Sequence, residues 1–145
     1  MQKLFCEANV MYWGKCLLKL TYDFIDRSLA AYPDLPPFNS PHVHFIDAGL
    51  ALSYAPGVTR YSKVGSIHTA FLIEEFIEGR NNNFIKYIHN STATPLLDPD
   101  EEGYELTLFF CFAQHVQYAK TGGLAFISDF EGERNDLTKI VLSND

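Results

Sequence analysis

The chain has 145 residues, 47% of them hydrophobic and 14% aromatic, which is enough for one domain with a buried core and too apolar for a disordered chain. Eleven basic and eighteen acidic residues give a formal net charge of −7, which argues against a nucleic-acid partner because phosphate binding needs a basic face. No apolar run approaches the ~20 residues that cross a bilayer, so no membrane association is expected. Three widely spaced cysteines without a CxxC motif favour reduced thiols, and hence an intracellular, cytoplasmic location.

Two helices are predicted from the spacing of apolar residues. The first covers residues 5–31, where apolar side chains recur at steps of three and four and share one face: Val10, Trp13, Leu17, Leu20 and Phe24. Four prolines between 33 and 41 then predict an extended loop. The second helix is predicted over 104–113, with one face formed by Leu106, Phe109, Phe110 and Ala113.

Further segments predict strands. Residues 42–54 favour a strand with a glycine interruption, a candidate bulge, at Gly49. Residues 55–66 are polar and predict a loop, and a second strand is expected over 67–79. Residues 84–90 are aromatic and β-branched, and they fit either a strand or the start of a helix.

After the second predicted helix, the apolar period changes to alternation. Val116 and Tyr118 alternate before a Thr-Gly-Gly turn at 121–123, which predicts a hairpin. Its second strand ends in two acids on one face, Asp129 and Glu131. Such carboxylates can share one Mg²⁺ or raise the pKa of one another, whereas spacing alone favours the alternative of a solvated hairpin end.

Two isolated residues also have open alternatives. Lys86 lies in an aromatic run and either reaches out to solvent or contacts a phosphate group. A lone histidine such as His115 is more often a capping or packing residue than a zinc ligand, because zinc sites take three or four Cys or His groups.

Read in order, four segments resemble the C-terminal part of the alpha-type protein kinase domain, most closely its divergent, fungal-type members. They are FLIEEFIEG (71–79), FIKYIHN (84–90), QHVQYAKTGGLAFISDFEG (114–132) and DLT (136–138). Two earlier segments, EANVMYWGKCLLKLTYDFID and PPFNSPHVHFIDAGLAL, extend the resemblance over most of residues 5–138. Each motif alone is weak, so the specificity of the match comes from their order and spacing.

The resemblance implies an α+β, alpha-kinase-like fold over residues 1–145 as one domain. It implies ATP and Mg²⁺ as cofactors, and transfer of the γ-phosphate to serine or threonine of a protein substrate. The residues matched to the nucleotide site, at the hinge and beside it, are Glu74, Glu75, Phe76, Lys86 and Asn90. Asp129 matches the carboxylate that is proposed as catalytic base or phosphate-side group in the family, and Glu131 takes the place of a glutamine that coordinates Mg²⁺.

The chain also departs from the family pattern. The second metal-binding acid of the family falls at Lys139, where a cation repels Mg²⁺. The ATP-anchoring lysine and the later zinc-site cysteines have no counterpart, so the expected domain is shortened at both ends, has an incomplete N-terminal lobe and holds no zinc at His115. A second hypothesis is therefore an inactive kinase-like module that binds a partner protein through an exposed sheet edge.

Neither hypothesis predicts the oligomeric state. The nucleotide-site hypothesis requires one particular geometry. Asp129 and Glu131 must face a cleft beside the segment from Phe71 to Asn90, with Asp129 close to Lys86.

Overall fold

The structure, a computed structural model, describes residues 2–32, 40–54, 67–77, 84–90, 92–133 and 139–141. Its elements in chain order are α1 (Gln2–Ala31), β1 (His44–Phe45), β2 (Ala48–Tyr54), β3 (Ile67–Glu74), β4 (Phe84–Lys86), α2 (Tyr104–Lys120), β5 (Glu131–Glu133) and β6 (Lys139–Val141). Helices and sheets together make the fold α+β, as the sequence predicts. Neither helix in the described ranges combines the length and the apolar character that a bilayer span needs.

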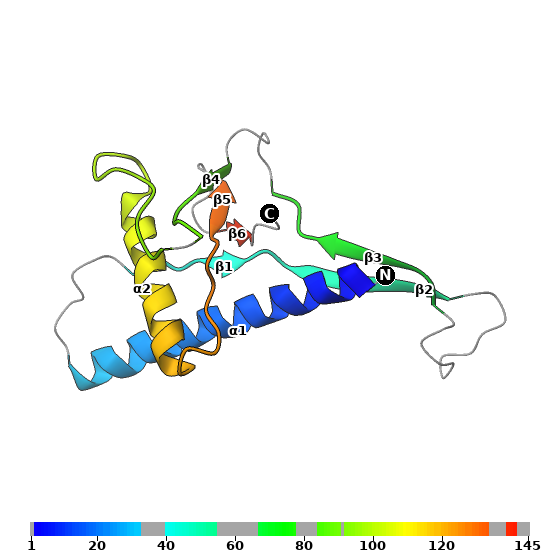
Figure 1. The fold of residues 1–145 in the computed structure, drawn as a ribbon, viewed down its shortest axis with the longest axis horizontal. Helices are drawn as coiled ribbons and strands as arrows, with labels where there is room; N and C mark the ends of the chain where they lie inside the picture. The colour runs from blue at the N-terminus through cyan, green and yellow to red at the C-terminus, as the bar shows by residue number, and fades with distance from the viewer. Residues whose placement is uncertain are drawn as a thin grey trace.

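Helix α1 runs along most of the length of the molecule (Figure 1). Helix α2 crosses its C-terminal half, and the β2–β3 ribbon lies along its N-terminal half and extends past its first turn. Between them lies a four-stranded sheet of order β1-β6-β5-β4, in which β1 and β6 are parallel and the other neighbours are antiparallel. The expectation of a long N-terminal helix beside a mostly antiparallel sheet is confirmed.

The strand predicted over 42–54 is divided between the two sheets. The chain leaves the four-stranded sheet after Phe45 and enters the β2–β3 ribbon at Ala48. Gly49, the predicted interruption, pairs regularly inside β2, and the one register shift lies between Ser53 and Tyr54. A glycine keeps both backbone hydrogen-bonding groups, so its presence alone does not break a ladder.

The other strand predictions have mixed outcomes. β3 begins at Ile67 as predicted but ends at Glu74, and residues 84–86 take the strand alternative. The loop predicted over 55–66, the strand end at Gly79, the DLT segment and all but the last of the four prolines lie outside the described residues.

Helix α1 has its predicted span but buries a different face. The buried positions are Met11, Gly14, Leu18, Thr21 and Ile25. Val10 and Trp13, which the apolar pattern placed on the packing face, are 49% and 63% exposed. The pattern missed the true face because a glycine and a threonine belong to it. The Thr21 hydroxyl donates to Leu17 O at 3.1 Å within the helix, which pairs its polar group.

The hairpin predicted over 115–130 is wrong, because α2 continues to Lys120. Burial along α2 keeps a spacing of three and four throughout: Leu106, Thr107, Phe109, Phe110, Ala113, Gln114, Val116 and Gln117. The apolar pattern did not reveal the helical period beyond Ala113, because two of the later buried positions are glutamines, Gln114 and Gln117. Polar residues on a packing face need hydrogen-bond partners, which only the folded chain can reveal.

The Thr-Gly-Gly sequence ends α2 instead of turning a hairpin. Gly122 and Gly123 have φ values of 66° and 81°, which glycine adopts without strain. Gly123 N–H donates to Tyr118 O at 2.8 Å, closing the last turn, and the Thr121 hydroxyl donates to Gln117 O at 2.8 Å. Glycines with positive φ occur both at helix C-termini and in hairpin turns, so the Thr-Gly-Gly sequence by itself did not distinguish the two.

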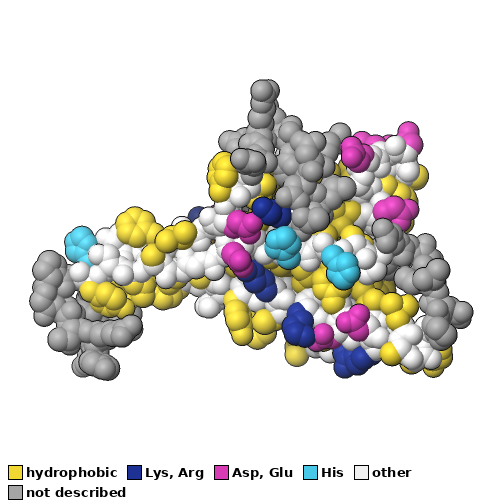
Figure 2. Space-filling model, turned by 180° about the vertical axis from the view of Figure 1, so that it is seen from behind, with side chains coloured by type: hydrophobic (Ala, Val, Ile, Leu, Met, Phe, Trp, Pro, Cys, Tyr) yellow, Lys and Arg dark blue, Asp and Glu magenta, His cyan; other side chains and the backbone are white. Residues whose placement is uncertain are grey.

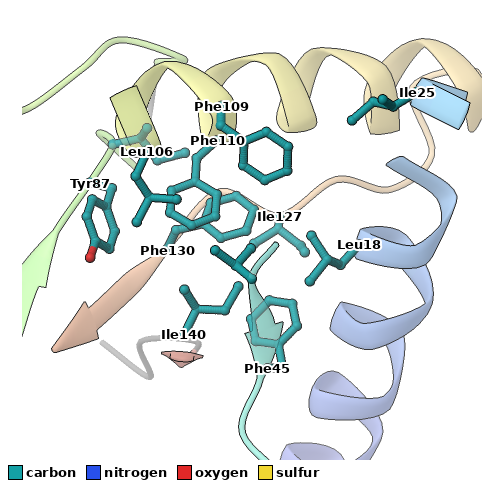
Figure 3. Close-up of a cluster of buried hydrophobic side chains, with 12 residues drawn as sticks. Leu18, Ile25, Phe45, Tyr87, Leu106, Phe109, Phe110, Ile127, Phe130 and Ile140 are labelled. Carbon is teal, nitrogen blue, oxygen red and sulfur yellow. The ribbon is translucent and has the colours of Figure 1, made fainter. Parts of the chain in front are cut away.

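The core lies where α2, the four-stranded sheet and the C-terminal half of α1 meet (Figure 3). Its largest members are aromatic. The Phe130 ring stacks on Phe110 with centroids 4.2 Å apart, Phe45 stacks on Phe130 at 6.3 Å, and Tyr87 packs on Phe110 at 5.1 Å. These rings join both helix and sheet layers into one packing unit.

Gly132 in β5 allows the closest approach in this sheet. A Cβ atom there would lie 2.9 Å from Lys139 O and 3.3 Å from the Tyr87 ring, so Gly132→Ala must push β5 and β6 apart. We expect a loss of ~1–3 kcal/mol in the free energy of unfolding, measured by urea denaturation. Gly49→Ala is the control, because nothing lies within 4 Å of its added Cβ. Equal losses in both variants would contradict this explanation.

Candidate active site

The candidate site is centred on an ion pair between β4 and the segment before β5. Lys86 Nζ lies 2.9 Å from Asp129 Oδ1, and the two side chains are 27% and 13% exposed. Asp129 Oδ1 is buried and accepts no aligned hydrogen bond from the described residues, so the ammonium group is what offsets its charge. The proximity of Asp129 to Lys86 that a nucleotide site requires is therefore present.

Buried neighbours hold both members of this ion pair. Tyr87 and Phe130 directly follow Lys86 and Asp129, and both are fully buried. Tyr87 N–H donates to Phe130 O at 3.0 Å, and both rings contact Phe110. Each charged residue is thus attached to a residue of the core, and the position of the ion pair is set by core packing.

Strand register brings further charges to the same face of the sheet. Lys86 pairs with Glu131, and Glu131 pairs with Val141, which lies two residues after Lys139. Because side chains alternate along a strand, Lys86, Glu131 and Lys139 share one face. Ile140 points the other way, into the core.

A second ion pair connects this face to the predicted hinge. Lys139 Nζ lies 2.8 Å from Glu75 Oε1, with the side chains 25% and 30% exposed. Glu75 Oε2 accepts the Asp47 N–H at 3.1 Å, and Asp47 Oδ1 in turn binds Lys15 Nζ at 2.6 Å. The chain of contacts joins β6, the end of β3, the β1–β2 junction and α1. Figure 2 shows basic and acidic side chains together at the middle of the molecule, where the ribbon meets the core.

Lys15 and Lys139 lower the pKa values of the carboxyl groups that they contact, Asp47 and Glu75. The pKa of Asp47 is held below its ordinary value mainly by the hydrogen bond and charge of Lys15. The pKa of Glu75 is lowered first by the hydrogen bond from Lys139, then by the Asp47 backbone N–H, with a smaller contribution from the charge of His44. Partial desolvation opposes both shifts without reversing them.

Two depressions lie beside α1, one at Asp129 and the other at Glu74 of the predicted hinge. The larger, about 310 Å³, lies between α1 and residues 125–129 and is bordered by Val10, Trp13 and Asp129. The smaller, about 110 Å³, is bordered by Val10 and Glu74. Val10 borders both depressions, so exposed residues of α1 that the apolar pattern assigned to the core border the depression at Asp129 instead.

The remaining predicted site residues lie outside both ion pairs. Phe76 is 78% exposed, and Glu74 and Asn90 are exposed as well. Glu131 is half-buried on the charged face of the sheet. Their roles at the nucleotide or the metal stay predictions.

Metal ligands are few in the described part of the chain. No three His, Cys, Asp or Glu side chains among these residues come close enough to hold a metal ion. His115 is exposed on α2, and its expected lack of zinc stays a prediction. Mg²⁺ with ATP needs only one or two carboxylates, because phosphate oxygens and water complete its shell. Glu131 can supply one carboxylate, so the donor set fits Mg²⁺ bound together with ATP.

The pairing of Glu75 with Lys139 was not foreseen from the sequence. A cation at Lys139 was expected to repel Mg²⁺, but Glu75 offsets its charge. The partners are far apart in the chain, and no local pattern links them. The parallel pairing of β1 with β6 brings Lys139 beside His44, and the backbone contacts of Asp47 bring Glu75 to the same place.

The lowered pKa values predict how stability depends on pH. The ion pairs contribute fully above the ordinary pKa values of 3.8 for Asp47 and 4.5 for Glu75, and the contribution is lost as pH falls through the lowered values. Lys139→Gln removes the hydrogen bond that is the main cause of the lowered pKa of Glu75. Its free energy of unfolding, measured in urea, should therefore fall less than that of the wild type between about pH 5 and pH 3.

Lys120→Gln is the control for this experiment, because it removes an equal charge whose contact is the Phe24 ring, 4.6 Å from Nζ to the centroid. It should keep the slope of the wild type. Parallel curves for the wild type and Lys139→Gln would show that the Glu75 pair does not contribute.

Comparison with known proteins identifies the family. The alpha-kinase family model matches residues 34–144, most of the chain and all of the residues in the two central ion pairs. A search of curated proteins gave no match, and a search of solved structures gave none either. Because this match covers more than half of the chain, the chain belongs to the alpha-kinase family.

Proposed function

We propose that the domain binds ATP with Mg²⁺ and transfers the γ-phosphate to serine or threonine residues of a protein, with Asp129 as the catalytic residue. The observation that carries the proposal is the Lys86–Asp129 ion pair, which places the acid matched to the family's catalytic group on an anchored, half-buried segment. Family membership supports the reaction class, and the α+β architecture is compatible with an alpha-kinase-like fold.

In the proposed reaction, the substrate hydroxyl oxygen bonds to the γ-phosphorus while the bond from that phosphorus to the bridging oxygen breaks, and ADP leaves. The hydroxyl proton passes to the Asp129 carboxylate. Lys86 Nζ contacts Oδ1, so Oδ2 is the oxygen left to accept the proton. Lys86 holds the carboxylate in one orientation, which is what an acceptor of a proton in a fixed geometry needs.

Magnesium would reach this site as its ATP complex. Glu131 is the carboxylate that would hold it, and Mg²⁺ would supply charge neutralisation at the phosphates. Glu74, Glu75 and Phe76 would meet the adenine. Lys86 would lie near the phosphates, and Asn90 would complete that segment of the nucleotide site.

A different observation favours a second function, an inactive kinase-like module that binds a partner protein. Lys139 occupies the position of the family's second metal-binding acid and is paired with Glu75, so that position contributes a cation instead of a ligand. Phe71 and Ile73 on β3 are more than half exposed, and such apolar side chains on a two-stranded ribbon suit contact with another protein.

The nucleotide proposal predicts stabilisation by ATP and Mg²⁺. At ~10-fold above Kd the ligand should raise Tm by roughly 2–5 °C, because it binds only the folded chain. EDTA should remove the effect, and Asp129→Asn should reduce it. Trp13, the single tryptophan, borders the larger depression, so its fluorescence should change at the same ATP concentration. Lys19→Gln, which breaks an exposed pair within α1, is the control. An undiminished shift in Asp129→Asn would refute the assigned site.

Phosphate transfer separates the two functions. With radiolabelled ATP and a mixture of serine and threonine peptides, an active kinase should label peptide, and Asp129→Asn should slow labelling by on the order of 10²-fold or more. The inactive module predicts no labelling by the wild type, together with retention of a partner protein that Phe71→Ser abolishes. Equal labelling by the wild type and Asp129→Asn would refute Asp129 as the catalytic residue, and no labelling by the wild type would exclude the kinase function.

A further inference from the structure

The segment that carries Asp129 is paired by side chains instead of by a strand. In the described part of the chain, residues 125–130 belong to no helix and to no strand. Gln117 Oε1 accepts the Ile127 N–H at 2.9 Å, and Gln114 Nε2 donates to Ile127 O at 3.1 Å. The two glutamines of α2 thus make both of the backbone hydrogen bonds that a neighbouring strand would make with Ile127.

Both glutamines are buried, and Gln117 has no exposed surface. Gln117 Nε2 donates to Thr21 Oγ1 of α1 at 3.2 Å, so both polar atoms of this side chain are paired. A buried amide with every atom paired keeps one orientation, because any other rotamer leaves polar groups without partners. Gln117 is therefore a rigid attachment for Ile127, and Gln114 adds a second hydrogen bond to the same residue.

We infer that Gln114 and Gln117 are positioning residues that set the place of Asp129 against Lys86. The inference rests on the proposed role of Asp129. Ile127 lies two residues before Asp129, and Phe130, fully buried, lies one residue after it. The short link between these two attachments leaves the carboxylate little freedom to move.

The attachment also includes α1. Thr21, which receives the Gln117 amide, is fully buried and lies before residues 34–144, the part of the chain that matches the family. Helix α1 thereby acts on the position of Asp129 through one buried side chain, without contributing a group to the chemistry.

The alternative is that the glutamines only stabilise the fold, and a matched control separates the two roles. Thr107 lies on the same helix, is fully buried, and donates its hydroxyl to Gly103 O at 3.3 Å, away from the Asp129 segment. Thr107→Val removes a buried hydrogen bond of α2 and leaves Ile127 attached. Gln117→Met and Gln114→Met remove the attachments with little change in side-chain length.

The first measurement needs no activity. In the full chain, NMR reports the carboxyl ¹³C shift of Asp129, and Lys86→Met gives the value for a broken ion pair. We expect Gln117→Met to move the wild-type value toward that of Lys86→Met, and to speed solvent exchange of the Ile127 amide by ~10-fold or more. Thr107→Val should change neither. If Gln117→Met fails to fold, Gln114→Met, which keeps the Thr21 contact, is measured in its place.

The second measurement is phosphate transfer, normalised to the folded fraction. A displaced Asp129 should lower kcat by on the order of 10²-fold and leave the KM for ATP nearly unchanged, since the hinge is not altered. Thr107→Val should keep the kcat of the wild type.

The outcomes distinguish the inference from the proposed function. An Asp129 signal that stays at the wild-type value in both glutamine variants overturns the positioning role, whether or not the protein is a kinase. A displaced signal with unchanged kcat also overturns it, provided that Asp129→Asn abolishes transfer. Absence of transfer by the wild type refutes the proposed function, and the NMR result then decides by itself whether the glutamines position Asp129.

Discussion

The stacking of Phe130 on Phe110 is the contact on which the rest of this structure depends. The centroids are 4.2 Å apart, both rings are fully buried, and Phe45 and Tyr87 extend the contact to β1 and β4. A close-packed interior holds the residues attached to it in place, because it cannot deform without losing van der Waals contacts. Since Asp129 precedes Phe130 directly, the place of this acid follows from aromatic packing. The ion pair with Lys86 then selects the orientation of the carboxylate within a location that is already fixed.

The charged groups around this core differ in what they contribute. Lys15 and Asp47 are exposed, so their attraction is screened by salt and adds little to stability. Lys86 and Asp129 are mostly buried, and separating them would leave one charge poorly solvated. The Lys86–Asp129 pair therefore fixes the positions of its two side chains more strongly than the exposed Lys15–Asp47 pair does. The Lys139–Glu75 pair lies between these cases, and Glu75 offsets the charge of Lys139. Kinase activity and a binding role are the two functions that this arrangement leaves in competition.

Sequence patterns predicted the fold well where apolar periodicity was long and poorly where polar residues were buried. The span of α1 was correct because its apolar spacing persists for many turns. Its packing face was wrong because Gly14 and Thr21 belong to it. The end of α2 was wrong for the same reason: Gln114 and Gln117 interrupt the apolar stripe, although their amides are paired with Ile127. Hydropathy records the cost of burying a polar group but not the partner that offsets the cost.

The sequence by itself determined that the chain is an α+β domain with a long first helix, and its ordered motifs were enough to indicate the kinase family and to select Asp129 and Lys86. Those features are local: they depend on spacing within a helix or on residue order within a motif. Only the tertiary structure decided that Lys139 meets Glu75 and that Gln117 joins Thr21 to the segment of Asp129. Each of these contacts joins residues far apart in the chain, and their pairing depends on how strands and helices pack. Packing is a property of the whole chain, so no single stretch of residues contains it.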